Sequence, residues 1–148
     1  MTSLREFVRE SNRIEGLHHE PTNVEMEMHD YLVKSSTLEV ADLELFVSQI
    51  QPGAKLREHP GMNVRVGTHI PKPGGPLIRG MLENILLDVP LSTPFDIHQR
   101  YETLHPFMDG NGRSGRALWL RMMGGVERVP LNFLHTWYYQ SLQNWRVM

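Results

Sequence analysis

The stretch HPFMDGNGRSGR spans residues 105–116 of this 148-residue chain and decides how the rest of it is interpreted. Gly110, Asn111 and Gly112 permit backbone conformations in which successive N–H groups point into one concavity. A helix that begins at these residues would add its own unpaired N–H groups and the positive end of its dipole. The stretch therefore predicts a cradle for an anion, and phosphate oxygens fit such a cradle.

The charged side chains of the same stretch suit a phosphate ligand. Arg113 and Arg116 stand three apart on the first turn of the expected helix, where positive charge opposes the helix dipole unless an anion is present. Asp109 offers a hard oxygen ligand of the kind that Mg²⁺ takes. His105 carries an imidazole, a group that titrates near neutral pH and can take a proton from an attacking hydroxyl. Phosphate, metal and base are thus expected around one loop.

The residues before this stretch are predicted to form three helices. Ser3 and Glu6 make a capping-box pattern ahead of apolar residues at helical spacing, which predicts a helix over residues 3–15 that Gly16 ends. Two further amphipathic stretches predict helices over residues 22–34 and 37–50.

Residues 60–76 differ in residue pattern from the predicted helices on either side. Positions 62–70 alternate weakly between apolar and polar residues, and Pro and Gly flank them closely. This pattern predicts an exposed β-hairpin or extended flap, with an ordinary surface loop as the alternative.

Helical patterns resume after the flap and continue to the end of the chain. We expect helices over residues 76–88 and 93–104, a third that starts at 110–112 and stops at 124–125, and a last one over 131–145. In the first of these, Ile78, Met81, Leu82 and Ile85 are predicted to face inward. The fold class is therefore mainly α: a compact helical bundle with a short β-hairpin flap, in which residues 1–148 form a single domain.

Composition narrows the function. The chain has no Cys, which excludes disulfides, thiolate zinc sites and cysteine nucleophiles. A formal net charge of −2 gives no reason to expect a nucleic-acid or anionic-membrane partner. The His18-His19-Glu20 cluster is interpreted as solvated polar surface, and the histidines other than His105 as ordinary surface or core residues. No run approaches the roughly 18 apolar residues of a membrane span, so we expect a cytoplasmic protein.

Residues 105–116 resemble the core motif of the Fic family, His-x-Phe-x-Asp/Glu-Gly-Asn-Gly-Arg-x-x-Arg, and match it at every defined position. A chance match has a probability on the order of one in 10¹⁰ per start site. His98, Tyr101 and Leu104 also stand where members often carry a His, an aromatic and an aliphatic residue. The resemblance implies the Fic fold.

The resemblance also implies roles for single residues. His105 would be the general base toward a Ser, Thr or Tyr hydroxyl of a target protein, Asp109 the ligand to Mg²⁺, and Phe107 a buried anchor. Arg113 would steady the leaving pyrophosphate, and Arg116 would hold the γ-phosphate. Phosphate oxygens would be bound by Gly110, Asn111 and Gly112. The flap that docks the target would comprise Val66, Gly67, Thr68, His69 and Ile70.

The activity that the resemblance implies is protein adenylyltransfer, the movement of AMP from Mg-ATP to a protein hydroxyl. Gly110 and Arg113 favour it over phosphorylation, because the kinase-like branch similar to Doc departs from this form of the motif. The alternatives are removal of AMP at the same site, another nucleotidyl or phosphoryl transfer, and a nucleotide-binding regulatory module without turnover. His105 argues against the last alternative. The protein's own chain as a target of the transfer, and a homo-oligomer, are further alternatives.

Ser11-Asn12-Arg13-Ile14-Glu15-Gly16 resembles the family's inhibitory motif Ser/Thr-x-x-x-Glu-Gly/Asn, so residues 1–16 are interpreted as an N-terminal inhibitory helix. Glu15 falls at the C-terminal end of its helix, where the dipole disfavours a carboxylate and a guanidinium would be a natural partner. The resemblance names Arg116 as that partner. The pair would deprive the γ-phosphate of its clamp, and the unmodified protein would be nearly inactive.

Overall fold

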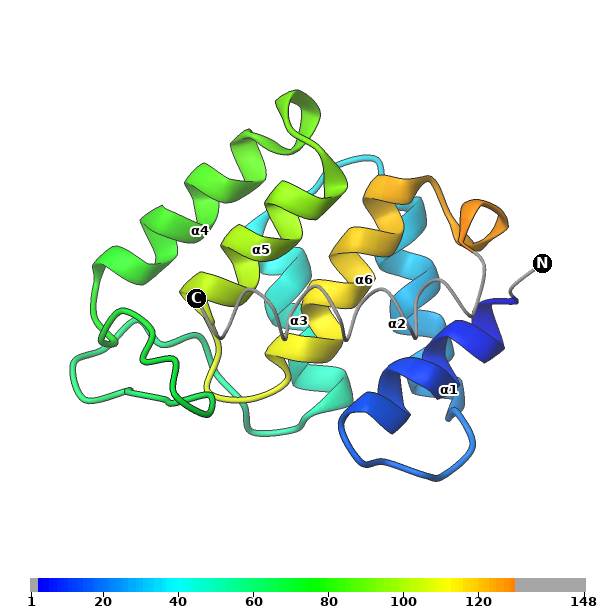
Figure 1. Ribbon diagram of the computed structural model, residues 1–148, viewed down its shortest axis with the longest axis horizontal. Helices are drawn as coiled ribbons and strands as arrows, with labels where there is room; N and C mark the ends of the chain where they lie inside the picture. The colour runs from blue at the N-terminus through cyan, green and yellow to red at the C-terminus, as the bar shows by residue number, and fades with distance from the viewer. Residues whose placement is uncertain (1–2, 130–148) are drawn as a thin grey trace.

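The computed structural model describes residues 3–129, and helices dominate this range (Figure 1). The elements in chain order are α1 (Leu4–Ile14), α2 (Asn23–Lys34), α3 (Val40–Ile50), α4 (Leu77–Leu87), the short 3₁₀ helix η1 (Val89–Leu91), α5 (Pro94–Leu104), α6 (Asn111–Met123) and the 3₁₀ helix η2 (Val126–Arg128). The mainly helical fold class is confirmed. The helix expected over residues 131–145 lies outside the described residues.

Side-chain caps explain where the first helices begin. The Ser3 hydroxyl accepts the Glu6 N–H at 3.1 Å ahead of α1. Thr22 and Glu25 form a reciprocal capping box ahead of α2. The third helix was expected from residue 37, but α3 begins at Val40, because the Asp42 carboxylate accepts the Glu39 N–H at 2.8 Å and sets the start of the helix there.

Helix α6 is the central element of the bundle. It packs against α1, α2, α3 and α5 (Figure 1), and nearly all of its residues from Asn111 to Leu120 are buried. Gly115 allows the close approach of α5, since a Cβ atom there would collide with the Glu102 carboxylate and the Tyr101 ring. Its first two turns, which carry the motif arginines, therefore lie inside the protein.

The apolar core has two parts. The larger cluster lies among α2 to α6 and includes Leu43, Phe46, Leu82 and Leu118. The smaller lies around Phe7, Trp119, Leu120 and Val129, where α1 meets α6. Helix α1, which carries the candidate inhibitory motif, is thus held to the bundle by its own packing.

One inward prediction for α4 is wrong. Ile78, Leu82 and Ile85 are buried as expected, but Met81 is 38% exposed. Helix α4 lies at the edge of the bundle and contacts α3 and α5 along one stripe (Figure 1). A helix at the edge buries a narrower face than the spacing of its apolar residues suggests.

The segment between α3 and α4 contains no regular strand within the described residues. The expected hairpin is reduced to one antiparallel pair, in which Val66 and His69 exchange backbone hydrogen bonds of 2.9 Å across a turn that includes Gly67. A second isolated bridge joins Leu56 to Phe107 and ties this segment to the motif loop. Within residues 3–129, no helix is long and apolar enough to cross a membrane.

Candidate active site

His105 ends α5 in a left-handed backbone conformation, with φ 51° and ψ 64°. Its N–H donates to the Tyr101 carbonyl at 2.9 Å, and its own carbonyl accepts from Arg57 Nε at 2.6 Å. A non-glycine residue held in this region costs on the order of 1–3 kcal/mol and persists only where its surroundings fix it. The chain therefore turns sharply after α5, and the imidazole is left partly exposed at the start of the motif loop.

Asn111 closes the loop between α5 and α6. Its Oδ1 accepts the Phe107 N–H at 2.8 Å, and its Nδ2 donates to the Phe107 carbonyl at 2.7 Å. Phe107 is buried, as expected for an anchor. Because the Asn111 side chain is engaged within the loop, the group it can offer to a phosphate is its backbone N–H.

The N-terminus of α6 presents backbone donors that have no hydrogen-bond partner within residues 3–129. Gly110 precedes the helix with φ 80° and supplies no side-chain cap. The first return hydrogen bond runs from the Ser114 N–H to the Gly110 carbonyl at 3.0 Å, so the N–H groups of Asn111, Gly112 and Arg113 come before the helical ladder begins. These donors and the positive end of the helix dipole lie where the anion cradle is expected, and phosphate binding by them stays a prediction.

Asp109 lies at the exposed lip of the cradle. One oxygen, Oδ1, accepts the Gly110 N–H at 2.8 Å. Among the described residues, no group of three or more His, Cys, Asp or Glu side chains could hold a metal by itself. Asp109 is therefore an exposed carboxylate beside the N-terminus of α6.

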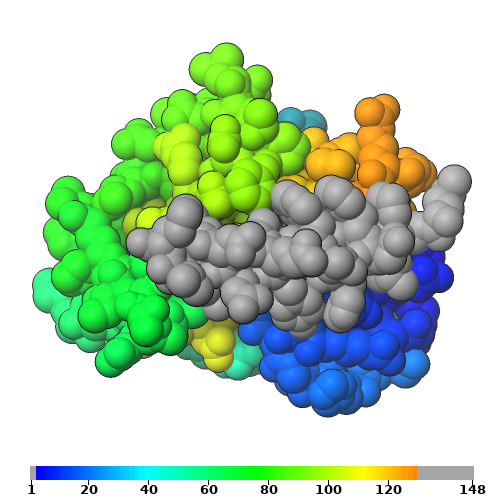
Figure 2. Space-filling model, in the orientation of Figure 1, coloured from blue at the N-terminus to red at the C-terminus, as the bar shows by residue number. Residues whose placement is uncertain are grey.

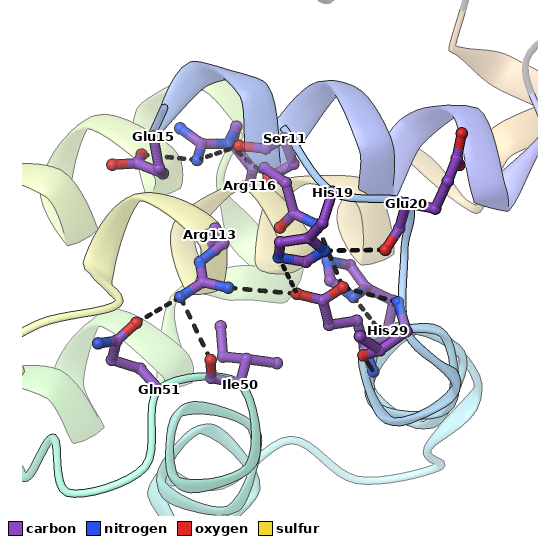
Figure 3. Close-up of polar contacts among 12 residues, drawn as sticks. Ser11, Glu15, His19, Glu20, His29, Ile50, Gln51, Arg113 and Arg116 are labelled. Atoms are coloured by element: carbon purple, nitrogen blue, oxygen red, sulfur yellow. Dashed lines mark hydrogen bonds and ion pairs between the residues drawn. The ribbon is translucent and has the colours of Figure 1, made fainter. Parts of the chain in front are cut away.

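Arg116 is almost fully buried and is held by α1 (Figure 3). Its Nε donates to the Ser11 hydroxyl at 2.8 Å and its Nη2 to the Ser11 carbonyl at 3.0 Å. Nη2 also pairs with Glu15 Oε1 at 2.7 Å. Gly112 makes room for this carboxylate, since a Cβ atom there would collide with it. The structure thus brings Ser11, Glu15 and Arg116 together, while the inhibitory role of the contact stays a prediction.

Arg113 is also buried but is held by α2 and α3 (Figure 3). Its Nη1 pairs with Glu25 Oε2 at 3.5 Å, and its Nη2 donates to Gln51 Oε1 at 2.6 Å and to the Ile50 carbonyl at 3.3 Å. Burial lowers the pKa of Arg113, and the nearby carboxylates of Glu25 and Glu15 oppose that shift. Sequence reasoning missed Glu25 and Gln51, because both lie far from Arg113 along the chain.

Two buried histidines flank these arginines and are neutral near pH 7. Burial lowers the pKa of His98 to about 3, and the positive charge of Arg116 adds to the shift. Burial likewise lowers the pKa of His29 to about 4, and its ring packs edge-on against Phe7 and Phe46. Both fit the expectation of ordinary core histidines. Glu20, from the cluster interpreted as surface, pairs with Arg9 at 2.8 Å.

The flap lies beside the end of α5. His69 Nε2 is 3.0 Å from the Thr103 carbonyl, and Val66 pairs with His69. Gly67, Thr68 and Ile70 are exposed. Figure 2 shows the surface on this side, where atoms of the motif region lie between the flap and the first helices. The predicted target-docking residues and the candidate base are therefore neighbours.

A mainly helical bundle that gathers a candidate base, an exposed carboxylate, a helix N-terminus and two arginines around one loop has the groups that phosphoryl-type transfer uses. The family model described as Fic/DOC family matches residues 4–123. The chain belongs to this family, whose members transfer nucleotidyl or phosphoryl groups to protein targets, typically in AMPylation-type reactions. No curated protein and no solved structure matches the chain.

Proposed function

We propose that this protein is a protein adenylyltransferase that moves AMP from Mg-ATP to a Ser, Thr or Tyr hydroxyl, and that Glu15 inhibits it. The observation that carries the proposal is the placement of two groups at the ends of one closed loop. His105 lies where the loop leaves α5, and the first N–H groups of α6 lie where the loop ends. This arrangement suits a triphosphate bound at the helix and a hydroxyl that approaches from the His105 side.

The reaction would use these groups in a single displacement. The hydroxyl oxygen forms a bond to the α-phosphorus, the bond from that phosphorus to the bridging oxygen breaks, and pyrophosphate leaves. His105 takes the hydroxyl proton. The α6 N–H groups hold phosphate oxygens at the positive end of the helix dipole, and Arg113 steadies the pyrophosphate. Orientation and neutralisation of charge would supply most of the rate.

Asp109 suits Mg²⁺ that arrives with the nucleotide. Mg²⁺ usually takes one or two protein carboxylates and completes its shell with phosphate oxygens and water, and Asp109 is one exposed carboxylate at the lip of the cradle. Bound there, the ion would neutralise charge on the phosphates. Asp109 itself would orient the phosphate chain relative to His105.

Inhibition follows from the contacts of Arg116. Its Nε and Nη2 donate to Ser11 and Glu15, so those donors are engaged when a triphosphate arrives. Without this clamp the γ-phosphate would settle elsewhere, and the α-phosphorus would turn away from the line of the hydroxyl. Replacement of Glu15 would return Arg116 to the γ-phosphate.

The test is the position of the transferred label. Wild type and Glu15→Gly would be incubated with a protein extract and Mg-ATP that carries radiolabel on either the α- or the γ-phosphate. We expect label on protein from α-labelled ATP only, together with the mass of AMP in intact mass spectrometry. Label that arrives from the γ-phosphate alone would replace the proposal with phosphorylation.

A further inference from the structure

Arg57 is a fully buried arginine that sequence analysis did not single out. It follows the turn after α3, and its guanidinium donates to four backbone carbonyls rather than to a carboxylate. The bonds run from Nε to His105 at 2.6 Å, from Nη2 to Leu104 at 2.8 Å, and from Nη1 to Met62 at 3.1 Å and Lys72 at 2.8 Å. No ion pair of Arg57 occurs within residues 3–129.

Two of these carbonyls belong to the end of α5. The last carbonyls of a helix have no intrahelical partner and carry the negative end of the dipole, so a guanidinium there is favourable. The Arg57 backbone adds a hydrogen bond from its N–H to the Pro106 carbonyl at 2.8 Å. Arg57 therefore surrounds the left-handed residue His105, with bonds to the residues on both sides of it and to His105 itself.

The other two carbonyls belong to the two ends of the flap. Met62 and Lys72 flank the bridge between Val66 and His69. The Arg57 carbonyl also accepts the Gly75 N–H at 3.0 Å. One side chain thus joins both ends of the flap to the end of the helix that presents the candidate base.

The base of the flap leaves little freedom for other arrangements. At Gly74 a Cβ atom would collide with the carbonyls of Met62 and His59. The Gly74 N–H donates to Asn63 Oδ1 at 3.0 Å. Because the flap closes tightly around the Arg57 guanidinium, the flap and His105 share one rigid reference point.

We propose that Arg57 is a positioning residue for the hydroxyl side of the reaction: it fixes the His105 backbone relative to the flap, so that a hydroxyl on a segment docked along the flap meets the imidazole. The inference rests on the proposed AMP transfer. Among residues 3–129, the Arg57 guanidinium bonds to the flap and the end of α5 alone, whereas Arg113 and Arg116 are held by other helices. Loss of Arg57 should therefore slow transfer without weakening ATP binding.

Arg121 provides a matched control. Its Nη1 donates to the Leu32 and Ser35 carbonyls at the end of α2, at 2.7 Å each. This is the same contact between a guanidinium and the carbonyls of a helix end, but the helix end is that of α2, and Arg121 lies near the C-terminal end of α6, beyond the motif residues 105–116. Arg121→Met should lower the free energy of unfolding as Arg57→Met does, but it should leave His105 and the flap in their positions.

The kinetic test uses the full chain with Glu15→Gly as the parent. Arg57→Met is expected to lower kcat for AMP transfer by about tenfold or more while the Kd for ATP changes by less than about twofold. Arg57→Lys keeps the charge but lacks the fork that reaches four carbonyls, so it should fall between parent and Arg57→Met. Arg121→Met should retain kcat within about twofold. An equal loss of kcat in Arg121→Met, or an ATP affinity that falls in step with kcat, would overturn the proposal.

Hydrogen exchange supplies a readout that does not depend on activity. Arg57→Met, or Arg57→Lys if the first variant does not fold, should speed amide exchange in residues 60–76 and 104–108 and leave 111–123 unchanged. If the Glu15→Gly parent transfers no AMP, the proposed function fails, and the exchange pattern still decides whether Arg57 joins flap and base. Unchanged exchange in either segment, or a uniform rise along the chain, would contradict the role of Arg57.

Discussion

Arg113 and Arg116 stand three residues apart on α6 and both are buried, yet their carboxylate partners differ. Glu15, the partner of Arg116, has a side chain that is 41% exposed. Glu25, the partner of Arg113, has one that is 8% exposed and also accepts the Thr22 N–H at 2.8 Å and Asn12 Nδ2 at 3.2 Å. A partly exposed carboxylate at a helix end can leave its partner at low cost, whereas a buried and fully bonded one cannot. Arg116 is therefore the arginine whose contacts can change, and Arg113 the one that is fixed.

The largest effect expected from this difference is on stability. Glu25→Ala leaves Arg113 buried without its carboxylate and removes a capping-box partner, so it should lower the free energy of unfolding by about 3–5 kcal/mol. Glu15→Ala should lower it by about 1 kcal/mol or less, since the Glu15 carboxylate is partly solvated and Arg116 keeps its bonds to the Ser11 hydroxyl and carbonyl. Urea denaturation of both variants measures the difference. Equal losses would remove the distinction between the two arginines.

The stability of the protein should also decrease in acid, because of His29 in α2. His29 Nδ1 donates a hydrogen bond to the Glu25 backbone carbonyl at 2.7 Å, and burial lowers the pKa of His29 from 6.5 to about 4. Between these values the unfolded chain binds a proton that the folded protein does not, so stability falls as the pH decreases from about 6.5 to about 4, by up to about 1.4 kcal/mol per pH unit. In His29→Leu this slope should be smaller. A slope that matches wild type would place the acid sensitivity elsewhere.

The next effect separates the base from the arginines. With Glu15→Gly as the parent, His105→Ala should lower AMP transfer by about 100-fold or more, because a general base contributes that much, while ATP affinity stays within about threefold. The two substitutions test different groups, because Glu15→Gly changes the contacts of Arg116 and His105→Ala removes the candidate base. Transfer that is undiminished in His105→Ala would remove the residue from the reaction.

Replacement of Asp109 should have a smaller effect on the rate of AMP transfer. Asp109→Ala is expected to lower transfer by about tenfold at low Mg²⁺ and to recover in part at high Mg²⁺ or Mn²⁺, because the ion keeps its phosphate ligands. A titration of rate against metal concentration measures this. An unchanged metal dependence would count against Asp109 as a ligand.

Local sequence patterns predicted much of the fold and part of the site. The helix start at Ser3 follows from its capping pattern, the helix after Thr22 follows from its amphipathic spacing, and His105 and Asp109 lie within one continuous motif. The start of α3 and the exposure of Met81 depend on packing, which spacing does not encode. The roles of Glu25 and Arg57 were not predicted, because they depend on contacts between segments that are far apart in the sequence. No local sequence pattern indicates such contacts.

The most direct test of the switchable arginine is AMP transfer by Glu15→Gly, measured with α-labelled ATP at saturating Mg-ATP beside wild type. Glu20→Gln serves as the control, because it alters an exposed carboxylate that pairs with α1 through Arg9 and does not touch Arg116. We predict that Glu15→Gly raises transfer by about tenfold or more, equivalent to about 1.4 kcal/mol in the barrier, while Glu20→Gln matches wild type. Equal transfer by wild type and Glu15→Gly would contradict the account and leave the Glu15–Arg116 pair a structural contact.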